Sequence, residues 1–198
     1  MCRFIETIRL ESGSLHNLPF HQARMDRAAM EILELKPAID LLQVFGNYDL
    51  PSNGLYKVRI VYGKELHSVE IAPYGIRSIK QMKIVFADSI SYDHKFENRK
   101  EVKKLFDQKG DCDDIVIIKN NQVTDASYAN LVFRRNGQWV TPSTYLLNGT
   151  MRQQLLDKKI IVEERISICD LVRYERVKLI NALVQFDGPE IDVSQIVK

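Results

Sequence analysis

Lys95 is a candidate for covalent chemistry, and it lies in the segment His-Lys-Phe-Glu-Asn-Arg at 94–99. A lysine amine forms an imine with an aldehyde and later carries a proton, provided that burial beside cationic groups lowers its pKa. A lone lysine is more often a solvated surface charge. Residues elsewhere in the chain must therefore decide between these two interpretations.

A second candidate region is the segment Val-Thr-Asp-Ala-Ser-Tyr-Ala-Asn-Leu-Val-Phe at 123–133, which contains Asp125 and Asn130. Taken alone, Asp125 is typical of a turn. The segment is informative because others follow it in a fixed order. These are Thr141-Pro142, Leu-Asn-Gly-Thr-Met-Arg at 147–152, and Ile-Asn-Ala-Leu at 180–183.

Gly149, Thr150 and Met151 have the form of an anion-binding helix start. A helix that begins near Thr150 points unpaired backbone N–H groups and the positive end of its dipole at a phosphate. Gly149 lets the backbone approach such a group closely. The alternative is an ordinary helix N-terminus with Asn148 as its cap. Glycine near a helix start is common, so this segment depends on the others for support.

Hydrophobic periodicity predicts the helices and strands that position these segments. We expect helices at 21–35, 39–46, 99–108 and 148–157, with Pro37 as the limit of the first. We expect strands at 4–10, 55–62, 67–73, 82–87, 114–119, 131–135, 138–141, 160–166 and 177–182. A polar segment at 76–81 divides the chain. We therefore expect a small domain at 1–75, a linker at 76–81 and a larger domain at 82–198.

The composition is that of an ordinary globular protein, with 45% hydrophobic and 27% charged residues among 198. The 28 basic and 26 acidic residues leave a net charge of +2, which is too small to predict a nucleic-acid partner. No apolar run is long enough to span a bilayer, and the N-terminus lacks the pattern of a signal peptide. The three cysteines fit free thiols, and neither they nor the four histidines form a metal-binding pattern. We expect a cytoplasmic protein without a membrane partner or a metal site.

The quoted segments, taken in order, resemble the class IV (fold type IV) pyridoxal-phosphate enzymes. This family contains branched-chain and D-amino-acid aminotransferases and 4-amino-4-deoxychorismate lyase. The similarity is collinear over about residues 6–183. The resemblance implies an α+β, fold type IV architecture with a small N-terminal α+β domain and a larger, β-barrel-like C-terminal α+β domain. The second of these binds the cofactor, pyridoxal 5'-phosphate, which is expected between the two.

The resemblance also implies a role for each candidate residue. Lys95 becomes the Schiff-base lysine and the catalytic residue. Asp125 pairs with the pyridine nitrogen and keeps the ring protonated. The usual residue there is glutamate, so the shorter aspartate needs a closer ring or a bridging water. The other cofactor-binding residues implied are Arg59, which reaches the phosphate, and Asn130, Gly149, Thr150, Met151, Asn181 and Ala182.

Three functions remain open. The neighbourhoods of Lys95 and Gly149 are closest to the lyase branch, which converts 4-amino-4-deoxychorismate to 4-aminobenzoate and pyruvate for folate synthesis. An aminotransferase of branched-chain or D-amino acids uses the same residues. The third is a shortened relative that no longer catalyses, because the chain lacks the opening strand pair of its relatives and stops soon after Leu183.

The resemblance implies two partners, which are a small-molecule amine substrate and a second copy of the chain. Relatives of this kind are usually homodimers in which the partner chain closes the pocket. His21, Arg24 and Arg152 also match family positions, and we assign structural roles to them.

Overall fold

The computed structural model of the protein describes residues 2–46 and 48–198. The chain divides into two compact units, each with its own hydrophobic core. The first unit comprises the chain up to Gly75 together with His94–Asn98, and the second comprises Ile76–Asp93 and Arg99–Lys198. The sequence-based division placed the segment that carries Lys95 in the C-terminal domain, whereas in the structure this segment belongs to the first unit.

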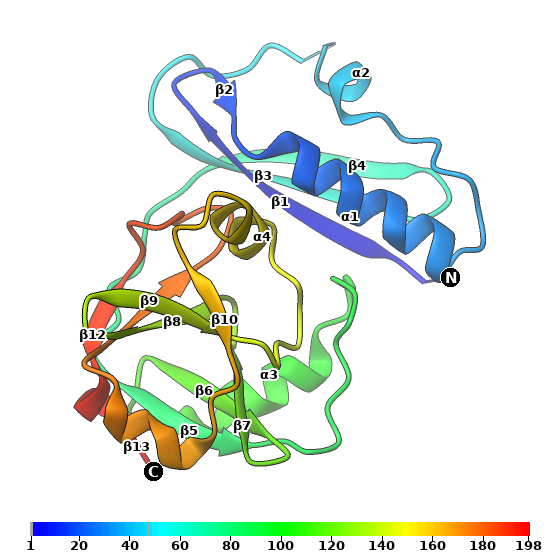
Figure 1. The fold of residues 1–198 in the computed structure, drawn as a ribbon. Helices are drawn as coiled ribbons and strands as arrows, with labels where there is room; N and C mark the ends of the chain where they lie inside the picture. The colour runs from blue at the N-terminus through cyan, green and yellow to red at the C-terminus, as the bar shows by residue number, and fades with distance from the viewer. Residues whose placement is uncertain (1, 47) are drawn as a thin grey trace. The chain divides into compact units, whose positions relative to one another are not determined.

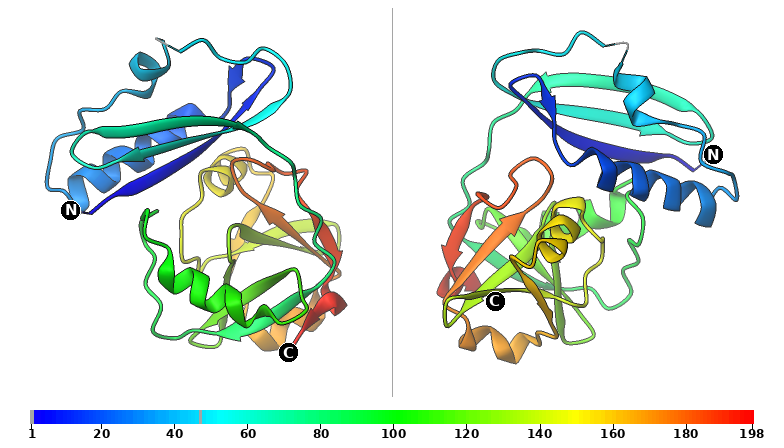
Figure 2. Two further views of the ribbon diagram at one scale, coloured as in Figure 1. Left: turned by 180° about the vertical axis from the view of Figure 1, so that it is seen from behind. Right: turned by 45° about the horizontal axis from the view of Figure 1, so that its top comes forward.

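The first unit is a four-stranded antiparallel sheet with a helix along one face (Figures 1 and 2). In the order of the sheet, its strands are β2 (Ser14–Leu15), β1 (Phe4–Glu11), β3 (Leu55–Tyr62) and β4 (Leu66–Pro73). Its helices are α1 (Leu18–Glu31) and the short α2 (Leu41–Phe45). Side chains of β1 and β3 that alternate along each strand pack against α1 to form the core.

Helix α1 begins and ends earlier than the predicted helix at 21–35. Pro19 lies in its first turn, where a missing backbone N–H breaks no hydrogen bond. The helix ends at Glu31, and the chain then turns at Glu34, whose φ is 56°. Leu33 still packs against the core after the helix has ended, so the hydrophobic spacing extended the prediction beyond the true end.

The second unit is a larger sheet of nine strands (Figure 1), with a main hydrophobic core and a smaller buried cluster beneath α4 (Thr150–Asp157). The strands are β5 (Met82–Phe86), β6 (Asp114–Lys119), β7 (Gln122–Ala126), β8 (Asn130–Arg135), β9 (Gln138–Pro142), β10 (Val162–Glu164), β11 (Arg176–Ile180), β12 (Glu190–Asp192) and β13 (Ile196–Val197). The helices are α3 (Lys100–Phe106) and α4 (Thr150–Asp157), with three short 3₁₀ segments at Asp107–Lys109, Ile168–Arg173 and Val193–Gln195. Parallel pairs join β5 to β6, β13 to β5 and β10 to β9.

Strand β8 is central to this sheet because it pairs with β7, β9 and β11. Asp125 of β7 and Asn130 of β8 are direct register partners. The four residues between them form a turn that a hydrogen bond from Ala126 N to Ala129 O closes at 2.9 Å. Strand β7 was not predicted from the sequence, although it carries one of the candidate residues. In the part of the chain that the structure describes, no helix has the length and apolar character needed to cross a membrane.

Candidate active site

Lys95 lies beside the start of β1. Its carbonyl oxygen accepts a hydrogen bond from Ile5 N at 2.9 Å, and the next residue, Phe96, bridges to Phe4. The Lys95 side chain is half-buried, and its ammonium donates a hydrogen bond to Thr7 Oγ1. The segment at 94–98 is therefore bound to β1, and the amine is held by a hydroxyl group of that strand.

Arg59 lies near the Lys95 segment within the first unit. It is the register partner of Thr7, so the two side chains lie on the same face of the sheet. The Arg59 guanidinium contacts Glu97 Oε1 and Glu70 Oε1, both at 3.3 Å. The structure thus brings Arg59 close to the lysine segment, with two carboxylates beside its charge.

A buried charged cluster in the first unit was not predicted as a whole. Glu6 and His21 are fully buried, and Arg24 is nearly so. Glu6 Oε2 lies 2.6 Å from His21 Nδ1, and Arg24 Nε donates to Glu6 Oε1 at 2.8 Å. The sequence did contain a signal for this cluster. Glu6 lies between Phe4 and Ile8 at every second position, so it shares the core face of β1 with them.

The cluster keeps Glu6 charged in the core. Burial raises the pKa of Glu6, but the charge of Arg24 and the hydrogen bonds from His21 and Arg24 outweigh this and hold it well below its usual range. Burial lowers the pKa of His21, although Glu6 acts in the opposite direction, and the positive charges of Arg24 and Lys95 add to the lowering. Neutral histidine and ionised glutamate therefore coexist here at pH 7.

In the second unit, β7 and β8 place Asp125 and Asn130 together. Asn130 Nδ2 donates to Asp125 Oδ1 at 2.8 Å. Leu146 N and Leu147 N donate to Asp125 Oδ2 at 3.0 Å and 2.9 Å. Burial raises the pKa of Asp125 to about 6, and these hydrogen bonds limit the rise. A buried acid of this kind can hold a cationic nitrogen once it is ionised.

Gly149 stands at the N-cap of α4, and no side chain caps that helix among the described residues. Asn148 does not act as the cap, because its Oδ1 accepts a hydrogen bond from Arg152 Nη1 at 3.3 Å. A Cβ atom at position 149 would lie 2.0 Å from Asn130 Oδ1, so any other residue there must displace the Asn130 side chain. The start of α4, with the buried residues Thr150 and Met151, is therefore suited to an anion.

Asn181 follows β11 and connects two loops. Its Nδ2 donates to Tyr128 O at 3.3 Å, and its Oδ1 accepts hydrogen bonds from Leu183 N and Val184 N at 2.8 Å and 3.0 Å. Ala182 is buried beside it in the sequence. Side-chain hydrogen bonds thus connect the segments that carry the candidate residues of this unit, which are Asp125, Asn130, Gly149, Thr150, Met151, Asn181 and Ala182.

The chain belongs to the class IV aminotransferase family, whose model matches residues 3–186. It is 35% identical to a protein of Haemophilus somnus, provisionally named a 4-amino-4-deoxychorismate lyase, with a TM-score of 0.87 over 92% of this chain and 97% of that one. It is 32% identical to a provisionally named aminodeoxychorismate lyase of Schizosaccharomyces pombe, over 78% of this chain and 74% of that protein. The family and the fold class predicted from the sequence are therefore confirmed.

The same fold occurs in more distant proteins. A hypothetical aminotransferase of Mycobacterium tuberculosis, in a PLP-bound form, is 13% identical to this chain. It matches with a TM-score of 0.80 over 99% of this chain and 81% of that one.

Proposed function

We propose that this protein is a pyridoxal-phosphate-dependent lyase that converts 4-amino-4-deoxychorismate to 4-aminobenzoate and pyruvate, a reaction of folate synthesis. The observation that carries the proposal is the hydrogen-bonded arrangement of a buried acid, Asp125, with a loop that leads to an uncapped helix start at Gly149. Support for the lyase reaction comes from the two relatives whose provisional names carry it. The PLP-bound mycobacterial structure of the same fold supports the cofactor.

The residues of the chain fit this cofactor. The carboxylate of Asp125 suits a protonated ring nitrogen, and the start of α4 suits a phosphate group. For Arg59 to reach the phosphate, its guanidinium must exchange a contact with Glu70 or Glu97 for one with the ligand. In this proposal Lys95 is the catalytic residue, and the further contacts to the cofactor come from Asn130, Thr150, Met151, Asn181 and Ala182.

Bound pyridoxal phosphate supplies an electron sink that stabilises negative charge at the amine-bearing carbon of the substrate. The Lys95 amine takes the proton from that carbon, and Thr7 holds the amine by accepting its hydrogen bond. Ionised Asp125 stabilises the positive charge on the ring nitrogen. The substrate ring would become aromatic as the bond between the ring and the enolpyruvyl oxygen breaks, and the released enolate would become pyruvate on taking up one proton.

The test is to mix the purified protein, pyridoxal phosphate and 4-amino-4-deoxychorismate without any keto acid. We expect release of pyruvate and 4-aminobenzoate in equal amounts. Lys95→Ala should abolish this release, whereas Lys64→Ala, which removes an exposed lysine of the same unit, should leave it unchanged. A lyase that is equally active without the Lys95 amine would contradict the assignment.

Two other outcomes point to the remaining functions. Conversion of the cofactor to its amine form by branched-chain or D-amino acids, without pyruvate release, identifies an aminotransferase. A protein that gives no visible absorption band with pyridoxal phosphate, and whose spectrum Lys95→Ala leaves unchanged, is a relative that no longer catalyses.

A further inference from the structure

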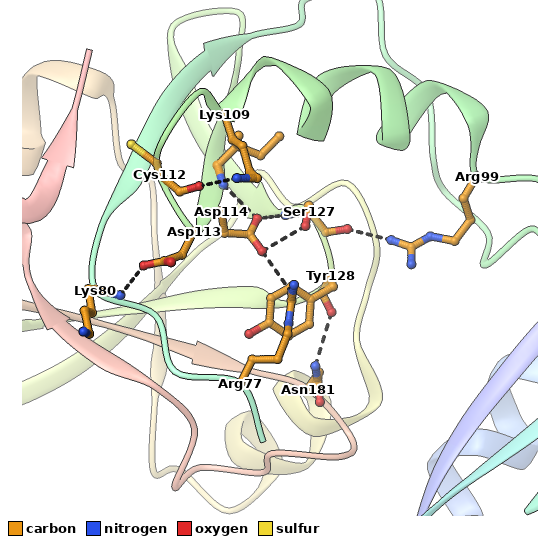
Figure 3. A network of polar contacts seen from close by, with 11 residues as sticks. Arg77, Lys80, Arg99, Lys109, Cys112, Asp113, Asp114, Ser127, Tyr128 and Asn181 are labelled. Carbon is orange, nitrogen blue, oxygen red and sulfur yellow. Dashed lines mark hydrogen bonds and ion pairs between the residues drawn. The ribbon is translucent and has the colours of Figure 1, made fainter. Parts of the chain in front are cut away.

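A second polar network holds the turn between Asp125 and Asn130, and it includes a fully buried carboxylate (Figure 3). Ser127 N donates to Asp114 Oδ1 at 3.0 Å, and Ser127 Oγ donates to Asp114 Oδ2 at 3.0 Å. Asp114 begins β6 and also accepts a hydrogen bond from Ile115 N at 2.7 Å. The carboxyl group of Asp114 is thus bound to the main chain and the side chain of one turn residue.

A cation binds the same turn residue through its remaining polar group. Arg99 Nη2 donates to Ser127 O at 2.6 Å, so the nitrogen, the hydroxyl and the carbonyl of Ser127 are all engaged. Arg77 lies beside Asp114, with Nη2 3.4 Å from Oδ2, and its guanidinium covers the Tyr128 ring at 4.4 Å. Figure 3 shows Arg77, Arg99 and Asp114 around the two turn residues.

Closing the turn does not require this network. The backbone bond between Ala126 and Ala129 already closes it, and strand pairing continues on both sides. Burial of a carboxylate is unfavourable unless its hydrogen bonds compensate, and burial raises the pKa of Asp114 despite the bonds from Ile115 and Ser127. The buried carboxylate therefore has a more specific effect, which is to fix the turn relative to β6.

We propose that Asp114 is a positioning residue, which sets the place of the Asp125 carboxylate by holding Ser127, two residues further along the turn. We call Asp114 and Arg99 the Ser127 clamp, because Asp114 binds the nitrogen and hydroxyl of Ser127 and Arg99 binds its carbonyl. Asp125 is held by Leu146 and Leu147 on one side, and the clamp fixes its strand on the other. The inference rests on the proposed function, in which Asp125 pairs with the ring nitrogen of the cofactor.

The test compares the full-length protein with Asp114→Asn, Asp125→Asn and the double variant. The dissociation constant for pyridoxal phosphate and the pH midpoint of the visible absorption of the loaded protein are measured for each. Asp114→Asn should weaken binding about three- to tenfold, the loss expected for one ordinary hydrogen bond. It should also move the midpoint in the same direction as Asp125→Asn. The double variant should bind no more weakly than Asp125→Asn alone, because both changes act through one carboxylate.

Asp113→Asn is the matched control, since it makes the same substitution one residue away. Asp113 accepts hydrogen bonds from Lys80 N and Gln81 N and does not contact the turn (Figure 3). The Asp113→Asn variant should have the same dissociation constant for pyridoxal phosphate, and the same pH midpoint, as the unmodified protein. If Asp114→Asn does not fold, Ser127→Ala replaces it, because this variant removes the hydroxyl bond to Asp114 Oδ2 and leaves every charge in place.

The clamp is overturned if Asp114→Asn, or Ser127→Ala in its place, lowers only the melting temperature and leaves affinity and midpoint unchanged. It is also overturned if the losses in the double variant add up. Binding that responds to Asp125→Asn but not to Asp114→Asn rejects this inference and leaves the proposed function intact. An unmodified protein that binds no pyridoxal phosphate rejects both.

Discussion

The carboxylate of Asp125 accepts three hydrogen bonds, and yet burial raises its pKa to about 6. It is therefore mostly ionised at pH 7 to 8 and mostly protonated below pH 6. Only the ionised form stabilises a protonated ring nitrogen. Aspartate is one methylene shorter than the usual glutamate, so its carboxylate reaches less far and its position is more critical.

We expect the affinity for pyridoxal phosphate to fall as the pH drops through about 6, because Asp125 then takes up a proton. Fluorescence titrations of the unmodified protein and of Asp125→Asn between pH 5 and 8 measure this effect. The phosphate group also titrates in this range, so the difference between the two proteins isolates Asp125. Equal pH dependence in both would show that this carboxylate does not contact the ring.

Gly149 lies against the Asn130 side chain, with no room for a Cβ atom between them. In Gly149→Ala the new methyl group collides with Asn130 Oδ1, whose amide nitrogen is bonded to Asp125 and to Leu147 O. We expect a loss of about 1–3 kcal/mol in the free energy of unfolding of the apoprotein, together with weaker cofactor binding. Asn130→Ala removes the colliding oxygen, so the added cost of Gly149→Ala should be smaller in that background. Denaturant titrations of the four proteins measure this coupling, and purely additive losses would contradict it.

At the scale of elements, the sequence predicted best what local patterns determine. The strands predicted at 55–62 and 114–119 have the same bounds as β3 and β6. The alternation within β3 and the continuous apolar run of β6 are local properties, which one segment displays by itself. Strand β7 was not predicted, because its last four residues are all buried and two of them, Thr124 and Asp125, are polar.

Pairing between distant segments could not be predicted in the same way. The parallel pairs β5–β6, β13–β5 and β10–β9 join strands whose partners are not marked in the sequence. The resemblance predicted which segments carry the candidate residues, but the contacts of Glu6 with α1 and of Asp114 with Ser127 were not predicted. Such contacts bring together residues that are 13 to 18 positions apart.

The packing of β1 against α1 depends on the pair of Glu6 and Arg24. Glu6→Gln leaves the Arg24 charge buried without its counter-ion, so the free energy of unfolding should fall by about 3–5 kcal/mol. Glu11→Gln on the same strand is the control, because the Glu11 carboxylate is open to solvent and its ion pair with Arg9 should contribute little. Urea denaturation at pH 7 measures both variants.

The difference in the free energy of unfolding between the unmodified protein and Glu6→Gln should depend on pH. The pKa of Glu6 is lowered in the folded state, so its contribution is complete above the ordinary glutamate pKa of about 4.3 and is lost as the pH falls below it. The gap in the free energy of unfolding between the unmodified protein and Glu6→Gln should therefore become smaller in acid. A gap that stays constant from pH 7 to pH 3 would mean that Glu6 is not held as an ion.

At the scale of the whole molecule, the chain passes between its two units more than once. It leaves the first unit after Gly75, returns for His94–Asn98 and leaves again at Arg99. The catalytic lysine of the proposal is therefore bound to β1 of the first unit, whereas the acid and the helix start belong to the second. Each unit therefore carries part of the proposed set of cofactor residues.

Homodimer formation remains a prediction from the family resemblance, and it has a measurable consequence. A dimer has twice the chain mass of 22.9 kDa, which light scattering detects directly. If the partner chain closes the pocket, pyridoxal phosphate binds the dimer more tightly than the monomer, and mass action links the two equilibria. Dilution should then weaken cofactor binding, and excess cofactor should shift the protein towards the dimer. A monomer that binds the cofactor equally well at all protein concentrations would show that one chain completes the site.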